Sequence, residues 1–358
     1  MAAGRKDFHL FGLGNALLDI QVAVDEDLLR QLQVPKGTMA LVDHEEQRDL
    51  IAQLQQQIVQ RSSGGSAANT IITFARLGGR AAYGTILGND ELADFIAQEF
   101  AALNIALFAP RHSELPTGSC LVLITPDAER TMKTALAANL HFSPEHVAEE
   151  ALQRSEWLYV EGYKFSEQSG AEAIDRAIFY AQRHETEVAV TVSDVFIIEH
   201  FRREVEQSLN AARIVFCNEQ EAMALTEQET PERAFRALSR RVACVIMTRG
   251  AEGSWIWWEG REYRIPAYPA NPVDTTGAGD TYAAAFLFAM VQGKSPEVAG
   301  HFASLAGARV VSQFGARLSS EHIQELKRLF PVMEKTLQYG KTHKRQVQPV
   351  QPPEDGAR

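Results

Sequence analysis

The chain has 358 residues, 45% hydrophobic and 23% charged, and its formal net charge is −11 at pH 7. These values are ordinary for a globular protein with a sizeable core, and the acidic balance excludes a general nucleic-acid binder, which requires a basic surface. The three cysteines, Cys120, Cys217 and Cys244, are widely spaced, so we expect neither a disulfide framework nor a zinc site. The longest apolar run, Ala283–Val291, is far shorter than the roughly 20 residues that span a bilayer. With no signal-peptide pattern at the start, these features predict a cytoplasmic protein with neither nucleic acid nor a membrane as a partner.

Apolar segments and helix-like segments alternate along much of the chain. Five short segments have the composition of buried strands: Phe8–Gly14, Trp157–Tyr163, Val188–Asp194, Arg213–Asn218 and Cys244–Gly250. Between the later ones lie segments with helical character, such as Ala171–His184 and Pro231–Arg241. This alternation predicts an α/β fold in which a mostly parallel sheet carries helices on both faces.

Two segments break this rhythm. Asp19–Leu28 and Ser119–Leu136 alternate apolar and polar residues, as antiparallel ribbons exposed on one side do. They predict a small β lid over the main sheet, formed by segments of about 16–44 and 111–137 within one domain of residues 1–335. Residues 336–358 are polar and, toward the end, proline-rich, so we expect a flexible tail there.

Ligands of an open parallel sheet bind beyond the carboxyl ends of its strands, and one motif near such an edge carries specific chemistry. Asp274–Asp280, with the sequence DTTGAGD, holds only small residues between two aspartates, and Thr281–Gly293 after it reads as a buried helix. The GAG loop, Gly277–Gly279, would therefore present free backbone N–H groups and a helix dipole to an anion such as a phosphate. Asp280 would lie beside that anion, where a general base is its obvious role, and a plain helix cap is the alternative. Asp274 is expected to order the loop or to help place a cation.

Two further motifs follow predicted strands. In Asn218–Glu221, an amide and a carboxylate three residues apart on a helix could hold a hydrated Mg²⁺, or could form a plain helix cap. Thr248–Ser254 turns through two glycines and is either an ATP-contacting loop or an ordinary turn. The phosphate-binding pattern GxxxxGK[ST] is absent, and GxGxxG at Gly12 lacks its third glycine.

Near the beginning of the chain, two motifs suit a sugar-like ligand. Ser63–Asn69 contains a diglycine that permits close approach of the backbone to a ligand, and Asn69 offers an amide for a hydroxyl. Asn15 and Asp19 are an amide and a carboxylate four residues apart, a pair that suits two hydroxyls of a sugar ring. Each motif alone also reads as a simple turn or helix start.

Together, in this order, the motifs resemble the PfkB or ribokinase-like carbohydrate kinase family. Its signatures are matched by Asp274–Asp280, Gly64–Thr70 and Asn218–Glu221, and the resemblance extends from about Phe8 to Leu318. Within the family, Phe11–Ile20 and Pro116–Thr125 make the chain most similar to the adenosine kinase branch and its bacterial members. The resemblance implies a ribokinase-like fold and transfer of the γ-phosphoryl group of ATP to the 5′-hydroxyl of a nucleoside, with adenosine as the leading candidate.

The resemblance also implies a role for each matching residue. Asp280 is the base, and the amides of Gly277, Ala278 and Gly279 form the anion hole. Arg130 is a lid cation that reaches the transferring phosphate. The implied substrate-binding residues are Asn15, Leu17, Asp19, Gly64, Gly65, Asn69 and Met132. The implied ATP-binding residues are Asn218, Glu221, Thr248, Gly250, Gly253 and Gln313, of which Asn218 and Glu221 organise Mg²⁺ through water.

Alternatives stay open at this point. A sugar kinase acting on ribose, fructose or a related sugar is the second hypothesis, and a catalytically silent relative with a binding role is the third. ATP and Mg²⁺ are the expected cofactors, K⁺ is an open candidate, and either a monomer or a homodimer fits the sequence.

Overall fold

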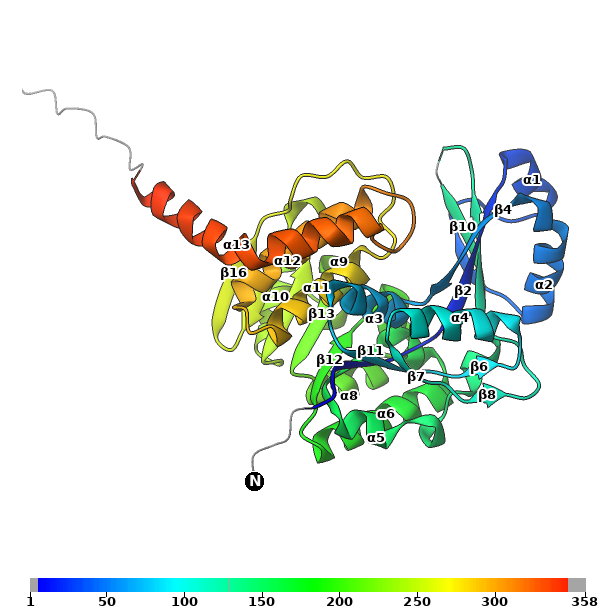
Figure 1. Cartoon of the computed structure of the whole chain (residues 1–358), viewed down its shortest axis with the longest axis horizontal. Helices are drawn as coiled ribbons and strands as arrows, with labels where there is room; N and C mark the ends of the chain where they lie inside the picture. Colours follow the sequence, from blue (N-terminus) through cyan, green and yellow to red (C-terminus); the bar gives the residue numbers. More distant parts are fainter. Residues whose placement is uncertain (1–5, 128, 347–358) are drawn as a thin grey trace, which may run out of the picture.

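The computed structural model describes residues 6–127 and 129–346, and its centre is a nine-stranded sheet (Figure 1). In spatial order its strands are β16 (Arg261–Ile265), β15 (Ser254–Trp258), β14 (Cys244–Thr248), β13 (Ile214–Asn218), β12 (Glu187–Thr191), β11 (Ser155–Glu161), β1 (Phe8–Leu13), β5 (Ala81–Gly84) and β7 (Ala106–Phe108). All neighbours from β14 to β7 pair in parallel, and β15 and β16 extend the sheet as an antiparallel edge. All five segments predicted as buried strands are strands of this sheet.

Helices cover both faces of the sheet, as the apolar strands predict. Successive residues of β11 point to opposite faces, so that Leu158 and Val160 belong to one buried core and Tyr159 to the other. The core that contains Tyr159 is closed by α3 (Ser66–Leu77), α4 (Glu91–Ala102), α11 (Ala278–Val291), α12 (Pro296–Val311) and α13 (Ser320–Gln346). The opposite core is closed by α5 (Glu149–Gln153), α6 (Gln168–Arg183), α7 (Val195–His200), α8 (Arg202–Ala211), α9 (Glu219–Thr226) and α10 (Pro231–Ser239). The α/β, ribokinase-like fold class is thereby confirmed.

A second, smaller sheet forms the lid, which stands beside the main body in Figure 1. Its strands, in spatial order, are β3 (Met39–Leu41), β10 (Arg130–Ala135), β9 (Ser119–Ile124), β2 (Leu17–Ala23) and β4 (Ile58–Gly64). The predicted antiparallel pattern is correct for β9 with β10. It is wrong for the lid as a whole, because β2 pairs with β9, and β3 with β10, in parallel. The predicted ribbon Asp19–Leu28 is a strand only as far as Ala23, and its last residues belong to α1 (Glu26–Gln31). The sheet is therefore mixed, and it includes β4, which the sequence did not reveal.

The two faces of the lid have different surroundings. Leu18, Ile20 and Val22 of β2 are buried in the core that also holds Leu29 of α1 (Glu26–Gln31). Helix α2 (His44–Gln53) covers the lid too, since its buried Gln47 donates hydrogen bonds to backbone carbonyls of both β9 and β10. The alternate residues of β2, Leu17, Asp19 and Gln21, lie on the opposite face and line a cavity. A two-stranded ribbon of β6 (Leu87–Gly88) and β8 (Arg111–His112) lies nearby.

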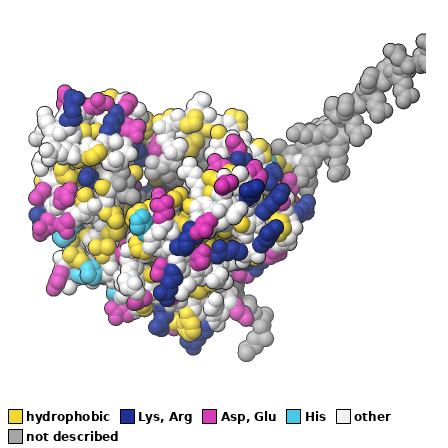
Figure 2. All heavy atoms as spheres, turned by 180° about the vertical axis from the view of Figure 1, so that it is seen from behind, with side chains coloured by type: hydrophobic (Ala, Val, Ile, Leu, Met, Phe, Trp, Pro, Cys, Tyr) yellow, Lys and Arg dark blue, Asp and Glu magenta, His cyan; other side chains and the backbone are white. Residues whose placement is uncertain are grey.

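Helix α13 projects from the body at the far end from the lid (Figure 1) and continues to Gln346, into the segment expected to be a tail. Residues 347–358 of that expected tail lie outside the described part of the chain. Acidic and basic side chains are interspersed over the face seen in Figure 2. Within residues 6–127 and 129–346, no helix combines the length and the apolar character that a membrane crossing requires.

Candidate active site

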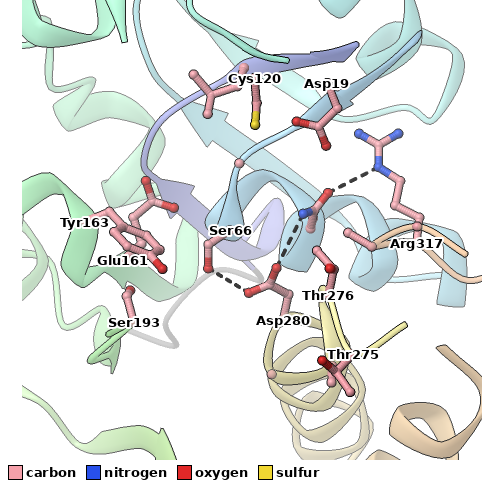
Figure 3. A pocket seen from close by; sticks show the side chains of 18 of the residues that line it. Asp19, Ser66, Cys120, Glu161, Tyr163, Ser193, Thr275, Thr276, Asp280 and Arg317 are labelled. Atoms are coloured by element: carbon pink, nitrogen blue, oxygen red, sulfur yellow. Dashed lines mark hydrogen bonds between the residues drawn. The ribbon is translucent and has the colours of Figure 1, made fainter. Parts of the chain in front are cut away.

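A cavity of about 940 Å³ lies between the inner face of the lid and the carboxyl ends of the central strands. Side chains from the lid, including Asp19, Cys120 and Met132, form one wall. Residues at or just beyond the strand ends, including Glu161 and Asn218, line the cavity as well. The beginnings of α3 and α11 and the loop of residues 313–320 complete it, and Figure 3 shows Ser66, Asp280 and Arg317 from these segments. Segments far apart in the sequence therefore converge on one site at the edge of the sheet where open α/β folds bind ligands.

The GAG loop begins α11 and presents its backbone to this cavity. Gly277 is the N-cap with φ of 74°, a left-handed conformation, and a Cβ there would collide with the carbonyl oxygen of Ala316. A Cβ on Gly279, in contrast, would meet no atom within 4 Å. Every residue of α11 from Thr281 to Ala289 is buried, so the dipole of this helix acts in a low-dielectric surrounding. The arrangement is suited to an anion above the first turn of the helix.

Asp280 lies in that first turn and points into the cavity (Figure 3). The Ser66 hydroxyl donates a hydrogen bond to its Oδ1 at 2.7 Å, and Asn69 Nδ2 lies 3.4 Å from its Oδ2. Burial raises the pKa of Asp280 to about 6, a shift that these two donors oppose and that the nearby Asp19 carboxylate supports. The carboxyl is therefore poised to ionise close to neutral pH, as a general base requires.

Asp19 lies on β2 with its carboxyl in the same cavity. Burial raises its pKa to about 6, while the positive charges of Arg317 and Arg130 act in the opposite direction. Gly64 does not line the cavity, but a side chain there would collide with the Asp19 carboxyl. Gly65, with φ of 102°, does line it, and a Cβ there would strike the carbonyl oxygen of Asn15. The two glycines make room for the residues that face the ligand space.

Arg130 and Asp274 connect the lid to the GAG loop. Arg130 Nη2 lies 2.7 Å from Asp274 Oδ2, and Nη1 donates to the Thr276 hydroxyl at 3.2 Å. Asp274 also accepts hydrogen bonds from the backbone N–H groups of Thr276, at 3.0 Å, and Gly315, at 2.8 Å. Asp274 thus orders the loop, one of the two roles expected for it, and it also holds the lid cation close to the anion site.

Asn218 and Glu221 form a capping box at the start of α9, the simpler alternative for this motif. Asn218 Nδ2 donates to Glu221 Oε1 at 2.6 Å, and the Asn218 backbone N–H donates to Oε2 at 3.0 Å. Burial raises the pKa of Glu221 to about 7, and the charge of Asp194 adds to the shift. Among the described residues, no group of three or more His, Cys, Asp or Glu side chains forms a metal cage. The pair, which lines the cavity, nevertheless fits Mg²⁺ held through water, because that ion usually keeps several waters and relies on substrate phosphates.

The remaining predicted site residues are divided by the structure. Thr248 and Gln313, expected around ATP, line the cavity, and so do Leu17, Met132, Asn15 and Asn69, expected around the substrate. Gln313 is engaged within its own loop, since it accepts from the Ser319 N–H at 3.1 Å and donates to the Arg317 carbonyl. Gly250 and Gly253 shape the turn after β14, with φ of 54° and 89°, and do not line the cavity.

Sequence reasoning missed several charged residues at the site. Arg317 lies 2.6 Å from Glu99 Oε1 and donates to Asn69 Oδ1 at 3.3 Å. Because Arg317 takes the oxygen of the Asn69 amide, the nitrogen of that amide is left to face Asp280. Glu161 is 1% exposed and accepts the backbone N–H groups of Asn15 and Ala67, each at 2.7 Å, and burial raises its pKa to about 7. Glu161 could have been noticed because it is a charged residue within the apolar segment that forms β11. Nothing in the sequence around Arg317 indicated a role in the site.

Known proteins share this fold. Residues 38–323 match the model of the pfkB family of carbohydrate kinases. The structure of adenosine kinase from Sinorhizobium meliloti has 32% sequence identity and a TM-score of 0.82, covering 90% of this chain and 99% of that one. A probable sugar kinase from Rhizobium etli CFN 42 has 30% identity and a TM-score of 0.82, with coverage of 90% and 98%. The 5-dehydro-2-deoxygluconokinase of Halalkalibacterium halodurans is 29% identical over 288 residues, which are 74% of this chain and 84% of that protein.

The ribokinase-like fold and this site define an ATP-dependent kinase that phosphorylates an alcohol group. The family model covers most of the chain, and the chain belongs to the pfkB family of carbohydrate kinases. The similar proteins above are divided between nucleoside and sugar kinases, so the acceptor must be argued from the site itself.

Proposed function

We propose that this protein transfers the γ-phosphoryl group of ATP to the 5′-hydroxyl of a nucleoside, with adenosine as the acceptor and AMP as the product. The observation that carries the reaction is the place of Asp280, a half-buried carboxyl with a raised pKa in the first turn of α11, directly after the GAG loop. A base and an anion site on consecutive residues bring an attacking hydroxyl and a phosphoryl group together.

The chemistry follows from this geometry. Asp280 accepts the proton as the acceptor oxygen forms its bond to the γ-phosphorus, and the bond from that phosphorus to the β,γ-bridging oxygen breaks to release ADP. The backbone N–H groups of Gly277 and Gly279 are available to the charge that develops on the transferring group. The Ala278 N–H donates to the Thr275 carbonyl at 3.2 Å in this structure and would have to leave that bond to join them. Arg130 lies beside the same loop, held 2.7 Å from Asp274, and contributes a positive charge there. Asn218 and Glu221 would hold Mg²⁺ through water, and that ion would supply positive charge to the ATP phosphates.

The apolar surface of the cavity favours a nucleoside over a bare sugar. Leu17, Val122 and Met132 of the lid line it, and two further apolar side chains remain open within it, Leu41 at 56% exposed and Phe196 at 48%. Exposed apolar side chains inside a ligand cavity are suited to a flat, weakly polar group such as a purine base. Asn15, Asp19 and Asn69 supply the polar groups that suit the ribose hydroxyls.

A sugar kinase is the second candidate, because the polar residues of the site would bind hydroxyls of any sugar ring. Ribokinases from Staphylococcus aureus and Bacillus subtilis are 25% and 27% identical to this chain. On this reading, the apolar lid face would contact the far side of a smaller substrate or remain unfilled.

A steady-state substrate panel decides between the two. With Mg-ATP as the donor, adenosine, inosine, guanosine, ribose, fructose and 5-dehydro-2-deoxygluconate are compared by kcat/KM, each with and without K⁺. We expect adenosine to have the highest value. A higher value for ribose, fructose or the gluconate would replace the nucleoside assignment with the sugar one.

A further inference from the structure

Lys164 has no exposed surface, although it carries a charged side chain. It lies in the short helical turn Gly162–Ser166 after β11, and its Nζ has three polar neighbours. The ammonium donates to Asn15 Oδ1 at 3.1 Å, to the Asn139 carbonyl at 2.8 Å and to Glu167 Oε2 at 2.5 Å. The three donors of a lysine are thus matched to three acceptors, which is the condition under which a buried lysine is tolerated.

The contact with Asn15 fixes which way the Asn15 amide faces. A lysine ammonium donates hydrogen bonds and accepts none, so the atom facing Nζ is the amide oxygen. The amide nitrogen, Nδ2, must then lie on the other side. Asn15 lines the cavity, and no acceptor for its Nδ2 is found in residues 6–127 and 129–346. Lys164 therefore presets Asn15 as a hydrogen-bond donor toward the ligand space.

The contact of Lys164 with the Asn139 carbonyl supports the backbone that follows Asn15. Asn139 follows β10, at the point where the chain returns from the lid, and its side chain bonds both backbone groups of Ala16. Its Oδ1 accepts from the Ala16 N–H at 3.2 Å and its Nδ2 donates to the Ala16 carbonyl at 2.9 Å. Lys164 thus joins two of the connections between the lid and the main body, residues 14–16 and 136–139.

We propose that Lys164 is a positioning residue for the phosphoryl acceptor. It holds Asn15 so that Nδ2 donates a hydrogen bond to a hydroxyl oxygen of the acceptor, next to Asp19, whose carboxyl accepts a hydrogen bond from a hydroxyl group. This inference rests on the proposed kinase function and deepens it. It assigns the hydrogen-bond donor to Asn15, which precedes β2, and the hydrogen-bond acceptor to Asp19, which lies in β2. It predicts an acceptor molecule with hydroxyl groups at that end of the cavity.

A purely structural ion pair between Lys164 and Glu167 is the competing explanation. Burial raises the pKa of Glu167, and its Oε1 has no hydrogen-bond partner among the described residues. If the ion pair is purely structural, loss of Lys164 lowers the stability of the protein and impairs all kinetic parameters together. The effect is then the same whether residue 15 is asparagine or alanine. On the positioning explanation, the loss acts through Asn15 and falls on the acceptor.

A double-mutant cycle separates the two explanations. Lys164→Met, Asn15→Ala and the double variant are assayed with adenosine and Mg-ATP. We expect Lys164→Met to raise the KM for adenosine about tenfold or more, the scale of a charged hydrogen bond, with the KM for ATP changed less than about twofold. The double variant should be no worse in kcat/KM than Asn15→Ala alone. Additive losses, or parallel increases in both KM values, would overturn the positioning role.

Two further variants keep the test decisive. Glu167→Gln is the matched control, because it touches the same ammonium without facing the ligand, and we expect it to change the KM for adenosine less than about threefold. If Lys164→Met does not fold, Lys164→Met/Glu167→Met removes the ion pair as a unit and leaves no unpaired buried charge. The cycle is then built on that variant, with the same expected non-additivity.

Failure of the proposed function is distinguishable from failure of this inference. If the wild-type enzyme prefers ribose to adenosine, the nucleoside assignment falls, and the cycle is measured with ribose against the same criteria. The crystal structure of Lys164→Met gives a readout independent of the acceptor. We expect the Asn15 side chain to leave its present position there, and an unchanged Asn15 side chain would overturn the inference.

Discussion

The ionisation of Asp280 is subject to opposing influences, and its role as the base can be tested by a single substitution. Burial disfavours its charge, while Ser66 and Asn69 donate hydrogen bonds to it. Asp280→Asn keeps the size of the side chain and removes the base, so we expect kcat to fall by about 100-fold or more, the scale of a general base. ATP binding, measured by calorimetry, and the circular dichroism spectrum should stay as in the wild type. An unchanged kcat would remove Asp280 from the mechanism.

The pH dependence of the reaction follows from the same residue. The pKa of Asp280 is raised to about 6, and the base is active only when ionised, so kcat/KM should rise with pH through about 6 and become level above about 7. Asp19, whose pKa is also raised to about 6, titrates together with it, so the profile reports the pair. Because the Asp19 charge contributes to the raised pKa of Asp280, Asp19→Asn should move the inflection to lower pH. A profile that is flat between pH 5 and 7 would contradict this assignment.

The sequence revealed some residues of the site and concealed others for a physical reason. Asp280, Asp19 and Asn69 lie in short motifs whose residue types suggest their chemistry. Glu161 and Arg317 reach partners 146 and 248 residues away, Asn15 and Asn69, and no local pattern encodes such contacts. Charged residues that act through distant partners become visible only when the fold brings them together.

At the scale of the element, α11 is buried along most of its length, whereas its N-terminus lies at the cavity. The two glycines at this N-terminus, Gly277 and Gly279, have different structural roles. Gly277→Ala would place a methyl group against the Ala316 carbonyl at a left-handed φ, so we expect both the thermal midpoint and kcat to fall. Gly279→Ala meets no neighbour and adds a better helix former, so the thermal midpoint should rise slightly while the methyl group obstructs the anion site and lowers kcat. Thermal unfolding and steady-state rates of both variants check this contrast, and a common change in the midpoint would contradict it.

The lid shows how far element prediction extends. Alternation in Asp19–Leu28 and Ser119–Leu136 identified the segments that contain β2, β9 and β10, because one face of these strands is buried. Strand β4 escaped notice because most of Ile58–Gly64 is polar or exposed, as is common at the edge of a sheet. Alternation also does not encode the direction of a partner, so the parallel pairing of β2 with β9 could be found only from the three-dimensional structure. Helices α6 and α10 were predictable from the segments Ala171–His184 and Pro231–Arg241 because each helix buries one regular face.

At the scale of the whole molecule, the cavity concentrates carboxyl groups that folding makes harder to ionise. Burial raises the pKa of Asp19 and Asp280 to about 6 and that of Glu161 and Glu221 to about 7. Each of these groups binds its proton more tightly in the folded protein than in the unfolded chain. The stability that they contribute is complete below about pH 4, the ordinary pKa of a carboxyl, and it is lost as the pH rises through 6 to 7. The active site therefore opposes the stability of the fold at the pH at which the enzyme would work.

We therefore predict that the free energy of unfolding of the ligand-free protein falls between pH 5 and pH 7. The fall is about 1.4 kcal/mol per pH unit for each proton that the folded protein still binds and the unfolded chain has released. Denaturant unfolding at pH 5, 6, 7 and 8 measures the slope. Asp280→Asn/Glu221→Gln removes two of the four groups and should reduce the slope to roughly half. Glu325→Gln is the control, because Arg309 lowers the pKa of Glu325 and its titration lies below this window. An equal slope in the double variant and the wild type would contradict this prediction. It would show that Asp280 and Glu221 do not cause the pH dependence of the unfolding free energy and that the protons are released by other groups.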